Sequence, residues 1–276
     1  MIQTNMPLIL IRGGGDLASG VALRLFRSGF GVVISEVAEP LSVRRYASFS
    51  EAVYAGEWQV EGVSAVLCKS AADVAGSVES GKIAAVVDPF ARITGDLAFL
   101  AVVDGRMLKH AESDSLYPGM FSIGLGPGFE VRINCDAVVE SNRGAALGRV
   151  YWQGKAQMDT GEPETVEGVG SQRVIRAARN GRFVSIHEIG EIVDLGEVIA
   201  RIDGEPVTAP FRGVIRGLLH SGTAVAQGLK IGDLDPRCDP GLCNRASDKA
   251  LAVGGGVLEA LLSRPKIRSA LGRPGK

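Results

Sequence analysis

The stretch from Pro7 to Gly20, PLILIRGGGDLASG, constrains the fold most, because an apolar run stops at three glycines and a helical pattern begins at once. Leu17, Val21 and Leu25 then recur every four residues, as on one face of a helix. A strand, a glycine turn and a helix in this order predict the phosphate-binding turn of a doubly wound α/β domain. The residues expected to bind a nucleotide there are Gly13, Gly14, Gly15 and Asp16.

A second apolar run, residues 32–34, ends in Glu36, which follows Gly15 by 21 residues. An acid at about this distance binds the ribose in dinucleotide-binding folds, so Glu36 favours NAD over NADP. Asp16 stands where a phosphate would meet the helix N-terminus, and like charges repel. Asp16 therefore either caps the helix or holds the anion through a bridging cation such as Mg²⁺.

The composition is that of an ordinary globular protein, with 276 residues, 46% of them hydrophobic and 22% charged. The net charge of −1 provides no global field toward nucleic acid or a membrane surface. There is no apolar run of membrane length and no leader peptide, so a cytoplasmic protein is expected. The 4 cysteines and 3 histidines are too scattered for a zinc pattern, and no metal-ligating residues are predicted.

Residues 178–234 contain an internal repeat with an offset of 32 residues, in which glycines at 181, 190 and 196 match glycines at 213, 222 and 228. Short apolar runs between glycine turns predict a small β-sandwich built from two similar halves. The region resembles the biotinyl and lipoyl carrier fold, a barrel-sandwich hybrid. The link between the halves, residues 202–207, contains no lysine for modification, so carrier function is not expected.

Four apolar runs end in a carboxylate, and three of these acids are the candidate catalytic residues Asp88, Asp104 and Glu140. Glu36 is the fourth. If the strands are parallel, their carboxyl ends place all four acids along one ligand crevice. Acids in such a row suit general acid/base work or a metal that bridges to a phosphate. The alternative is that each acid caps the helix after its strand.

A second glycine-rich loop follows the apolar run at residues 120–123. Alternate glycines there expose backbone N–H groups that suit an anion nest, to which Arg143 would add a side-chain donor. The alternative is a tight structural turn. The loop residues predicted to bind a cofactor are Gly124, Gly126 and Gly128.

The chain resembles a bacterial family described as selenium-dependent molybdenum hydroxylase system proteins or selenium-dependent molybdenum cofactor biosynthesis proteins. The resemblance is carried by motifs at 12–25, 36–57, 123–129, 140–150, 204–219, 228–237 and 247–262. It implies an N-terminal Rossmann-like domain and a role in maturing molybdenum hydroxylases. It implies no catalytic residues, so the candidate site residues come from the motifs alone.

The sequence therefore predicts an α/β fold with a Rossmann-like doubly wound domain at 1–165, completed by a helix at 245–263. A small all-β barrel-sandwich hybrid at 172–236 and a flexible tail at 264–276 are expected to follow. The predicted function is an accessory factor for a molybdenum hydroxylase client that binds a nucleotide or the molybdopterin cofactor in its dinucleotide form. The alternatives are an NAD-dependent oxidoreductase acting on a small substrate and a non-catalytic nucleotide-sensing module. Whether the protein is an enzyme, and its oligomeric state, are left open.

Overall fold

The computed structural model describes residues 2–110, 117–158 and 165–272. The chain divides into two compact units, each described here by itself. Unit 1 comprises residues 1–40, 48–159 and 246–276, and unit 2 comprises residues 41–47 and 160–245.

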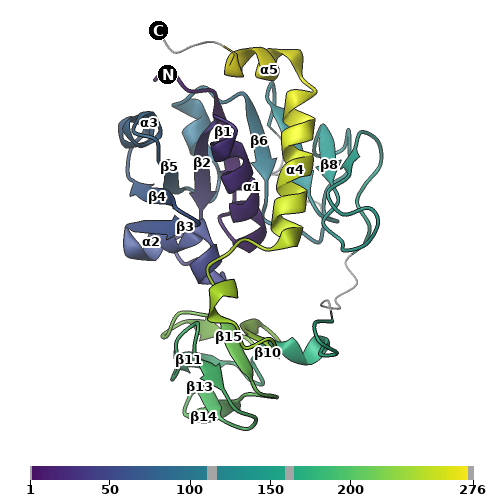
Figure 1. Ribbon diagram of the computed structural model, residues 1–276. Helices are drawn as coiled ribbons and strands as arrows, with labels where there is room; N and C mark the ends of the chain where they lie inside the picture. The colour runs from purple at the N-terminus through teal and green to yellow at the C-terminus, as the bar shows by residue number, and fades with distance from the viewer. Residues whose placement is uncertain (1, 111–116, 159–164, 273–276) are drawn as a thin grey trace. The chain divides into compact units, whose positions relative to one another are not determined.

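Unit 1 is built on a sheet of 9 strands in the described residues, with the order β3-β4-β5-β2-β1-β6-β7-β8-β9 (Figure 1). The strands are β1 (Leu8–Arg12), β2 (Gly31–Glu36), β3 (Glu57–Val60), β4 (Val63–Cys68), β5 (Ile83–Val87), β6 (Ala101–Asp104), β7 (Phe121–Leu125), β8 (Ala137–Val139) and β9 (Val150–Tyr151). Neighbours from β4 across to β8 run parallel, whereas β3 and β9 pair antiparallel at the two edges. The carboxyl ends of the parallel strands therefore share one edge of the sheet.

Helices cover both faces of this sheet, and strand alternation decides which side chains they meet. The helices are α1 (Asp16–Arg27), α2 (Ala52–Ala55), α3 (Ala71–Glu79), α4 (Asp248–Leu262) and α5 (Pro265–Leu271). Ile9 and Ile11 of β1 share a buried cluster with residues of α1 and α4. Leu10, which points the other way, belongs to a cluster with residues of α3. Figure 1 shows α1 and α4 side by side over one face.

Glycines in α4 allow a close approach that a larger side chain would prevent. A Cβ on Gly254 would lie 2.9 Å from the carbonyl oxygen of Gly20 in α1, and one on Gly256 would lie 2.1 Å from that of Gly148. Glycine costs about 1 kcal/mol relative to alanine inside a helix. Direct backbone packing against α1 and the loop before β9 offsets that cost.

Unit 2 consists of two antiparallel sheets of 4 strands each in the described residues, with orders β10-β17-β15-β12 and β14-β13-β11-β16. Its strands are β10 (Val174–Arg176), β11 (Gly181–Ser185), β12 (Ile192–Val193), β13 (Val198–Ile202), β14 (Glu205–Thr208), β15 (Gly213–Leu218), β16 (Ala224–Val225) and β17 (Lys230–Asp235). The first repeat forms β11 to β13 and the second forms β15 to β17. Each copy lends one strand to the other's sheet, since β12 pairs with β15 and β16 with β11. The predicted repeat is thus confirmed.

The predicted fold class, a Rossmann-like doubly wound domain with a small barrel-sandwich hybrid, is wrong. In the doubly wound order each new strand of a half adds outward, but here β5 lies between β2 and β4. The sheet also ends in antiparallel strands on both sides, and no α-helix connects β7 to β8. Unit 2 has two open sheets rather than a closed barrel. Apolar runs predict that strands exist, but strand order depends on contacts distant in sequence.

The unit boundaries differ from the predicted 1–165 and 172–236, because residues 41–47 belong to unit 2. The prediction of a flexible tail at 264–276 is corrected by α5. Ile267 of this helix is only 3% exposed and packs with the α1 and α4 core cluster. Residues 273–276 lie outside the described residues. None of the helices in 2–110, 117–158 and 165–272 combines the length and apolarity needed to cross a bilayer.

Candidate functional site

The sequence-predicted site residues of unit 1 gather along the carboxyl edge of the parallel strands. From the β5 side to the β8 side, the strand order places them in the sequence Asp88, Glu36, the turn 13–15, Asp104, the loop 124–128 and Glu140. The expectation that the four acid-ending strands are parallel is confirmed. The side-chain contacts show what each residue does at this edge.

The first glycine turn is filled by its own neighbours. The Gly14 N–H donates to Glu36 Oε1 at 2.8 Å, and the Val37 N–H donates to Oε2 at 2.7 Å. The Gly14 carbonyl accepts from the Ser50 N–H at 2.9 Å. A Cβ on Gly14 would come within 2.9 Å of both Ile34 and Ser50, so glycine is required there for packing. Glu36 thus stabilises the turn by accepting hydrogen bonds from its backbone. The contact of Glu36 with a ribose stays a prediction.

Asp16 does not cap helix α1 in the way the sequence allowed. The N-cap residue is Gly15, which has extended backbone angles and no side chain to accept a hydrogen bond. Asp16 is the first helical residue, where a negative charge is favourable beside the helix N-terminus. The N-cap alternative for Asp16 is therefore corrected, and the predicted binding roles of Gly13, Gly15 and Asp16 stay predictions.

Asp104 is the centre of a buried ion cluster between β1 and β6. Its side chain is 2% exposed, and Arg106 contacts both carboxylate oxygens, with Nη2 2.8 Å from Oδ2 and Nε 3.0 Å from Oδ1. Arg12, which is 1% exposed, lies 3.7 Å from Oδ2 and donates to the Tyr117 hydroxyl at 2.8 Å. Burial, followed by the charge of Asp104, raises the pKa of Tyr117 to about 12. Asp104 is thus positioned to neutralise arginines.

Glu140 is fully buried and holds two loops together. Its Oε1 accepts from the Asn142 N–H at 2.7 Å, and its Oε2 accepts from the Gln157 N–H at 2.8 Å. Both oxygens therefore have backbone donors, which gives Glu140 a structural role. The catalytic role expected for Glu140 stays a prediction, because the structural role alone accounts for these contacts.

The second glycine loop is occupied by side chains and backbone of the same unit. A Cβ on Gly124 would lie 2.1 Å from the ring of Phe129, and the Gly128 N–H donates to the Leu108 carbonyl at 2.8 Å. Gly126 has a φ of 90° and donates to the Val139 carbonyl at 3.4 Å. These contacts favour the tight structural turn that the sequence left open.

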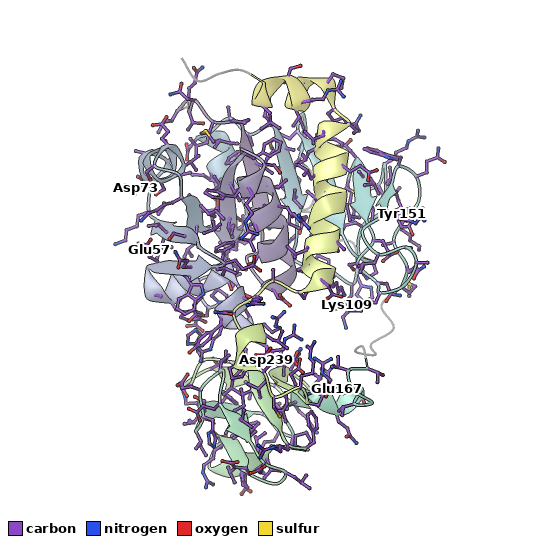
Figure 2. The ribbon with its side chains drawn as sticks, in the orientation of Figure 1. Glu57, Asp73, Lys109, Tyr151, Glu167 and Asp239 are labelled. Carbon is purple, nitrogen blue, oxygen red and sulfur yellow. The ribbon has the colours of Figure 1, made fainter. Side chains whose placement is uncertain are left out.

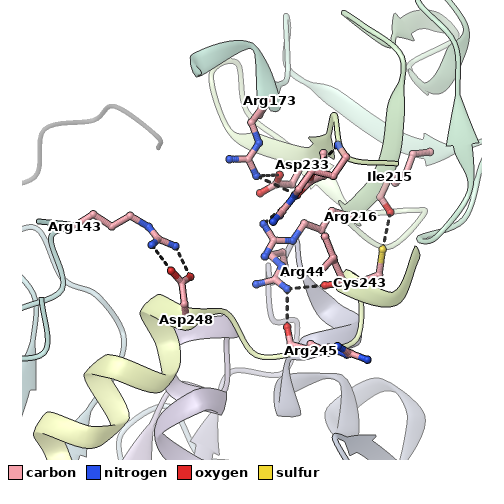
Figure 3. A network of polar contacts seen from close by, with 12 residues as sticks. Arg44, Arg143, Arg173, Ile215, Arg216, Asp233, Cys243, Arg245 and Asp248 are labelled. Atoms are coloured by element: carbon pink, nitrogen blue, oxygen red, sulfur yellow. Dashed lines mark hydrogen bonds and ion pairs between the residues drawn. The ribbon is translucent and has the colours of Figure 1, made fainter. Parts of the chain in front are cut away.

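Arg143, predicted to steady an anion, instead forms a bidentate pair with Asp248 in the first turn of α4. Nη1 and Nη2 each lie 2.7 Å from one carboxylate oxygen (Figure 3). Ser247 is the N-cap of the same helix, as the sequence predicted, and accepts from the Ala250 N–H. Arg143 therefore joins the loop after β8 to α4.

Asp88, one of the predicted catalytic acids, lines a cavity. The cavity has a volume of about 660 Å³ and lies at the carboxyl ends of the neighbouring parallel strands β4 and β5. We call it the β4–β5 pocket, which is lined by residues 67–70 and 86–90 with Arg92, Ile93 and Asp96. Its size falls within the range of small-molecule sites. Its position, outside the carboxyl ends of parallel strands, is where open α/β sheets bind ligands.

The site residues predicted from the sequence did not include Phe90 or Lys69, which line this pocket with Asp88 and Arg92. Phe90 is 64% exposed, and the Arg92 guanidinium lies 5.4 Å from its ring centroid. Lys69, at the end of β4, supplies a second cation. The available signal was the exposed aromatic in DPFAR directly after an apolar strand, because loops that follow parallel strands carry binding residues.

A smaller cavity of about 180 Å³ lies near the carboxyl ends of β6 to β8. Its lining includes Lys109, which Figure 2 labels, together with Asn142 and Lys249. It is too small to enclose a whole nucleotide. Within residues 2–110, 117–158 and 165–272, no group of three or more His, Cys, Asp or Glu side chains is placed to hold a metal ion.

Unit 2 contains its own charged cluster around Asp233 and Asp235, of which Asp235 is fully buried. Arg173 contacts both carboxylates at 3.6 Å, Arg216 contacts Asp235 at 3.6 Å, and Arg237 contacts it at 2.6 Å. Figure 3 labels Arg173, Arg216 and Asp233 of this cluster. Burial by itself raises the pKa of Asp235. The hydrogen bonds from Arg237, together with the positive charges of Arg237 and Arg173, outweigh burial and hold this pKa below its ordinary value. The cluster ties β17 to β15 and to the loop before β10.

The chain is similar to known proteins at two levels. It is 45% identical over 255 residues to "Uncharacterized protein YqeB" of Escherichia coli strain K12, a match that covers 92% of this chain and 47% of that protein. The chain thus spans about half the length of this curated relative. No family model matches the chain.

Two solved structures show a weaker likeness. One is a succinylglutamate desuccinylase/aspartoacylase from Rhodobacter sphaeroides, with 13% identity and a TM-score of 0.25 over 84% of this chain and 86% of that one. The other is an aspartoacylase family protein from Mesorhizobium loti, with 12% identity and a TM-score of 0.25 over 84% and 85%.

Proposed function

We propose that this protein binds a nucleotide-like ligand in the β4–β5 pocket and acts as an accessory factor in the maturation of a selenium-dependent molybdenum hydroxylase in the cytoplasm. The observation that carries the proposal is the cavity of about 660 Å³ at the carboxyl ends of β4 and β5. The motif resemblance across nearly the whole sequence supplies the connection to molybdenum hydroxylases. The ligand is a free nucleotide or the molybdopterin cofactor in its dinucleotide form.

The walls of the pocket suit the parts of a nucleotide. Leu67, Val87 and Phe90 form an apolar lining on which a flat base can stack. Lys69 and Arg92 provide positive charge for phosphates, and Arg92 also packs on the Phe90 ring. This combination of an apolar body and a few charged groups is typical of sites for small polar ligands.

Helix α3 does not supply the phosphate site, because its N-terminus is already capped. The Asp73 carboxylate accepts from the Lys69 and Ser70 N–H groups at 3.2 and 3.0 Å, and Ser70 Oγ accepts from the Asp73 N–H (Figure 2 labels Asp73). The carboxylate repels a second anion there. In this proposal the phosphates therefore contact the side chains of Lys69 and Arg92.

Mg²⁺, a catalytic base and NAD were also predicted from the sequence, and each has a smaller part in this proposal. A Mg²⁺ ion would be held mainly by the phosphates of the ligand, with one carboxylate of the pocket. Asp88 is the candidate base if a reaction takes place. The NAD-dependent oxidoreductase and the nucleotide-sensing module stay alternative predictions, and NAD gains no support from Glu36, whose two oxygens accept from Gly14 and Val37.

Calorimetric titration of the full chain tests the binding part of the proposal. The ligands are NAD, NADP, ATP, CTP and molybdopterin cytosine dinucleotide, and at least one is expected to bind with a submillimolar dissociation constant. If none of them does, the proposed binding function is wrong.

Deletion of the coding gene in the native host tests the accessory role. Molybdenum hydroxylase activity in extracts is expected to fall, while the activity of a dehydrogenase without molybdenum stays constant. Full hydroxylase activity in the deletion strain would contradict the role.

A further inference from the structure

Asp88 is fixed in the β4–β5 pocket by hydrogen bonds to both its backbone and its carboxylate. Its N–H donates to the Glu36 carbonyl at 2.9 Å, and its carbonyl accepts from Ser35 Oγ at 2.7 Å. Its Oδ2 accepts from the Ile93 N–H at 2.8 Å. Backbone and carboxylate are thus fixed by separate hydrogen bonds. A group fixed in this way loses little conformational entropy when it contacts a ligand.

The turn after Asp88 carries an exposed aromatic ring, Phe90, that lines the same pocket. Ala91 has a φ of 55°, in the left-handed region that costs a non-glycine residue energy, and it is 2% exposed. Its N–H donates to the Asp88 carbonyl at 3.1 Å. The turn buries Ala91 and leaves Phe90 exposed at the pocket. An exposed aromatic ring and a fixed carboxylate therefore lie within one short turn.

We infer that the β4–β5 pocket binds a nucleobase that bears an exocyclic amino group, which donates a hydrogen bond to the Asp88 carboxylate while the base stacks on Phe90. This inference rests on the proposed nucleotide-binding function and names the class of base. An ionised carboxylate only accepts hydrogen bonds. It therefore attracts the amino group of adenine, guanine or cytosine and repels a carbonyl oxygen at the same position, as in uracil.

Three pairs of nucleotides that differ at the amino position test the inference by calorimetric titration of the full chain. GMP carries a 2-amino group that IMP lacks, AMP has a 6-amino group where IMP has a carbonyl, and CMP has a 4-amino group where UMP has a carbonyl. A hydrogen bond to a charged group is worth about 1.5–3 kcal/mol, so the amino member of at least one pair is expected to bind about tenfold or more tightly. Equal affinities within all three pairs would overturn the inference while leaving the binding function intact. No binding of any of the five nucleotides would overturn the inference and count against the proposed function as well.

The Asp88→Asn variant assigns the preference to one residue. Its Oδ1 still accepts from the Ile93 N–H, so the variant is expected to fold, and its Nδ2 then faces the ligand as a donor. The preference for the amino base should fall to about one or reverse, whereas Asp96→Asn, the other acid of the pocket, should keep it. Loss of the preference in Asp96→Asn with retention in Asp88→Asn would overturn the assignment. Circular dichroism and the melting temperature of both variants confirm that each is folded.

Discussion

The carboxylate of Glu36 accepts a hydrogen bond from the N–H of Gly14 at 2.8 Å, across a separation of 22 residues. The amide that the glycine motif would offer to a phosphate is thus bound by an acid of the next strand. Because this amide is already bonded, we place the candidate ligand site in the β4–β5 pocket rather than at the first glycine turn. It also predicts that Glu36 acts on stability.

The Glu36→Gln variant should lose about 1–3 kcal/mol of folding stability, because a Gln side chain cannot accept from both the Gly14 and Val37 N–H groups. Urea unfolding of the variant and of Glu39→Gln, an exposed control on the same loop, measures the difference. If Glu36 instead serves as the ribose ligand, the variant would keep its stability and lose NAD affinity.

The consecutive glycines of α4 should respond in opposite directions to alanine. Gly255 is exposed, and no atom lies within 4 Å of the place that a Cβ would take, so Gly255→Ala should gain about 1 kcal/mol from helix propensity. Gly256→Ala places a Cβ 2.1 Å from the Gly148 carbonyl oxygen and should lower the melting temperature. Thermal unfolding of both variants measures the two changes in melting temperature. Equal changes for the two substitutions would contradict the close packing described for α4.

Tyr117 should make the stability fall at high pH. Its pKa is raised by burial to about 12, against 10.0 for the free side chain, so between these values only the unfolded chain loses the phenolic proton. Stability that is complete below pH 10 is therefore lost as the pH rises toward 12, by at most about 2–3 kcal/mol. The stability difference between the wild type and Tyr117→Phe, measured by urea unfolding at pH 9 and 11.5, should shrink at the higher pH. A difference that stays constant would show that the phenol is not buried as described.

Asp235 should be the most sensitive acid of unit 2. Removing its charge in Asp235→Asn leaves Arg173, Arg216 and Arg237 without a shared buried partner and should cost about 3–5 kcal/mol at pH 7. Because the folded pKa lies below the ordinary 3.8, the contribution of the carboxylate is complete above that value. It is lost as the pH falls through the folded pKa, so the cost should decrease in acid.

Glu205→Gln provides the control for Asp235. Glu205 forms an exposed pair with Arg179 at 3.8 Å, and such pairs contribute little. Urea unfolding of both variants at pH 7 and at a series of pH values below 3.8 should show a large, pH-dependent effect for Asp235→Asn alone. Equal effects at pH 7 would contradict the buried cluster.

The sequence was sufficient for features that depend on local pattern. The apolar runs before Glu36, Asp88, Asp104 and Glu140 form strands, because short apolar runs between turn signals bury both faces in a parallel sheet. The helix after Ser247 also begins where the N-cap signal places it. The glycine repeat is real in three dimensions, since Gly190 and Gly222 have φ of 101° and 92°, and Gly196 and Gly228 have 82° and 85°.

Features that depend on distant contacts could not be predicted in this way. Strand order is not encoded by any run of residues, and the hairpin of β3 and β4 precedes β5, which nevertheless lies next to β2. The Gly14 N–H is bound by the Glu36 carboxylate, which lies 22 residues further along the sequence. The β4–β5 pocket combines residues 67–70 with residues 86–96, and neither segment carries a recognised ligand motif. An acid after a strand therefore predicts a place on the sheet edge but not whether its carboxylate is available.

The most direct test of the central claim is the dissociation constant of GMP and CMP for Val87→Trp, a variant whose larger side chain fills the β4–β5 pocket. Val87 lines the pocket and is 46% exposed, so the substitution should leave the core intact. Val184→Trp on β11, at an equally exposed valine of unit 2, is the matched control. We predict at least about tenfold weaker binding of the nucleotide in Val87→Trp and unchanged binding in the control. Wild-type affinity in a folded Val87→Trp variant would contradict the claim that this pocket holds the ligand.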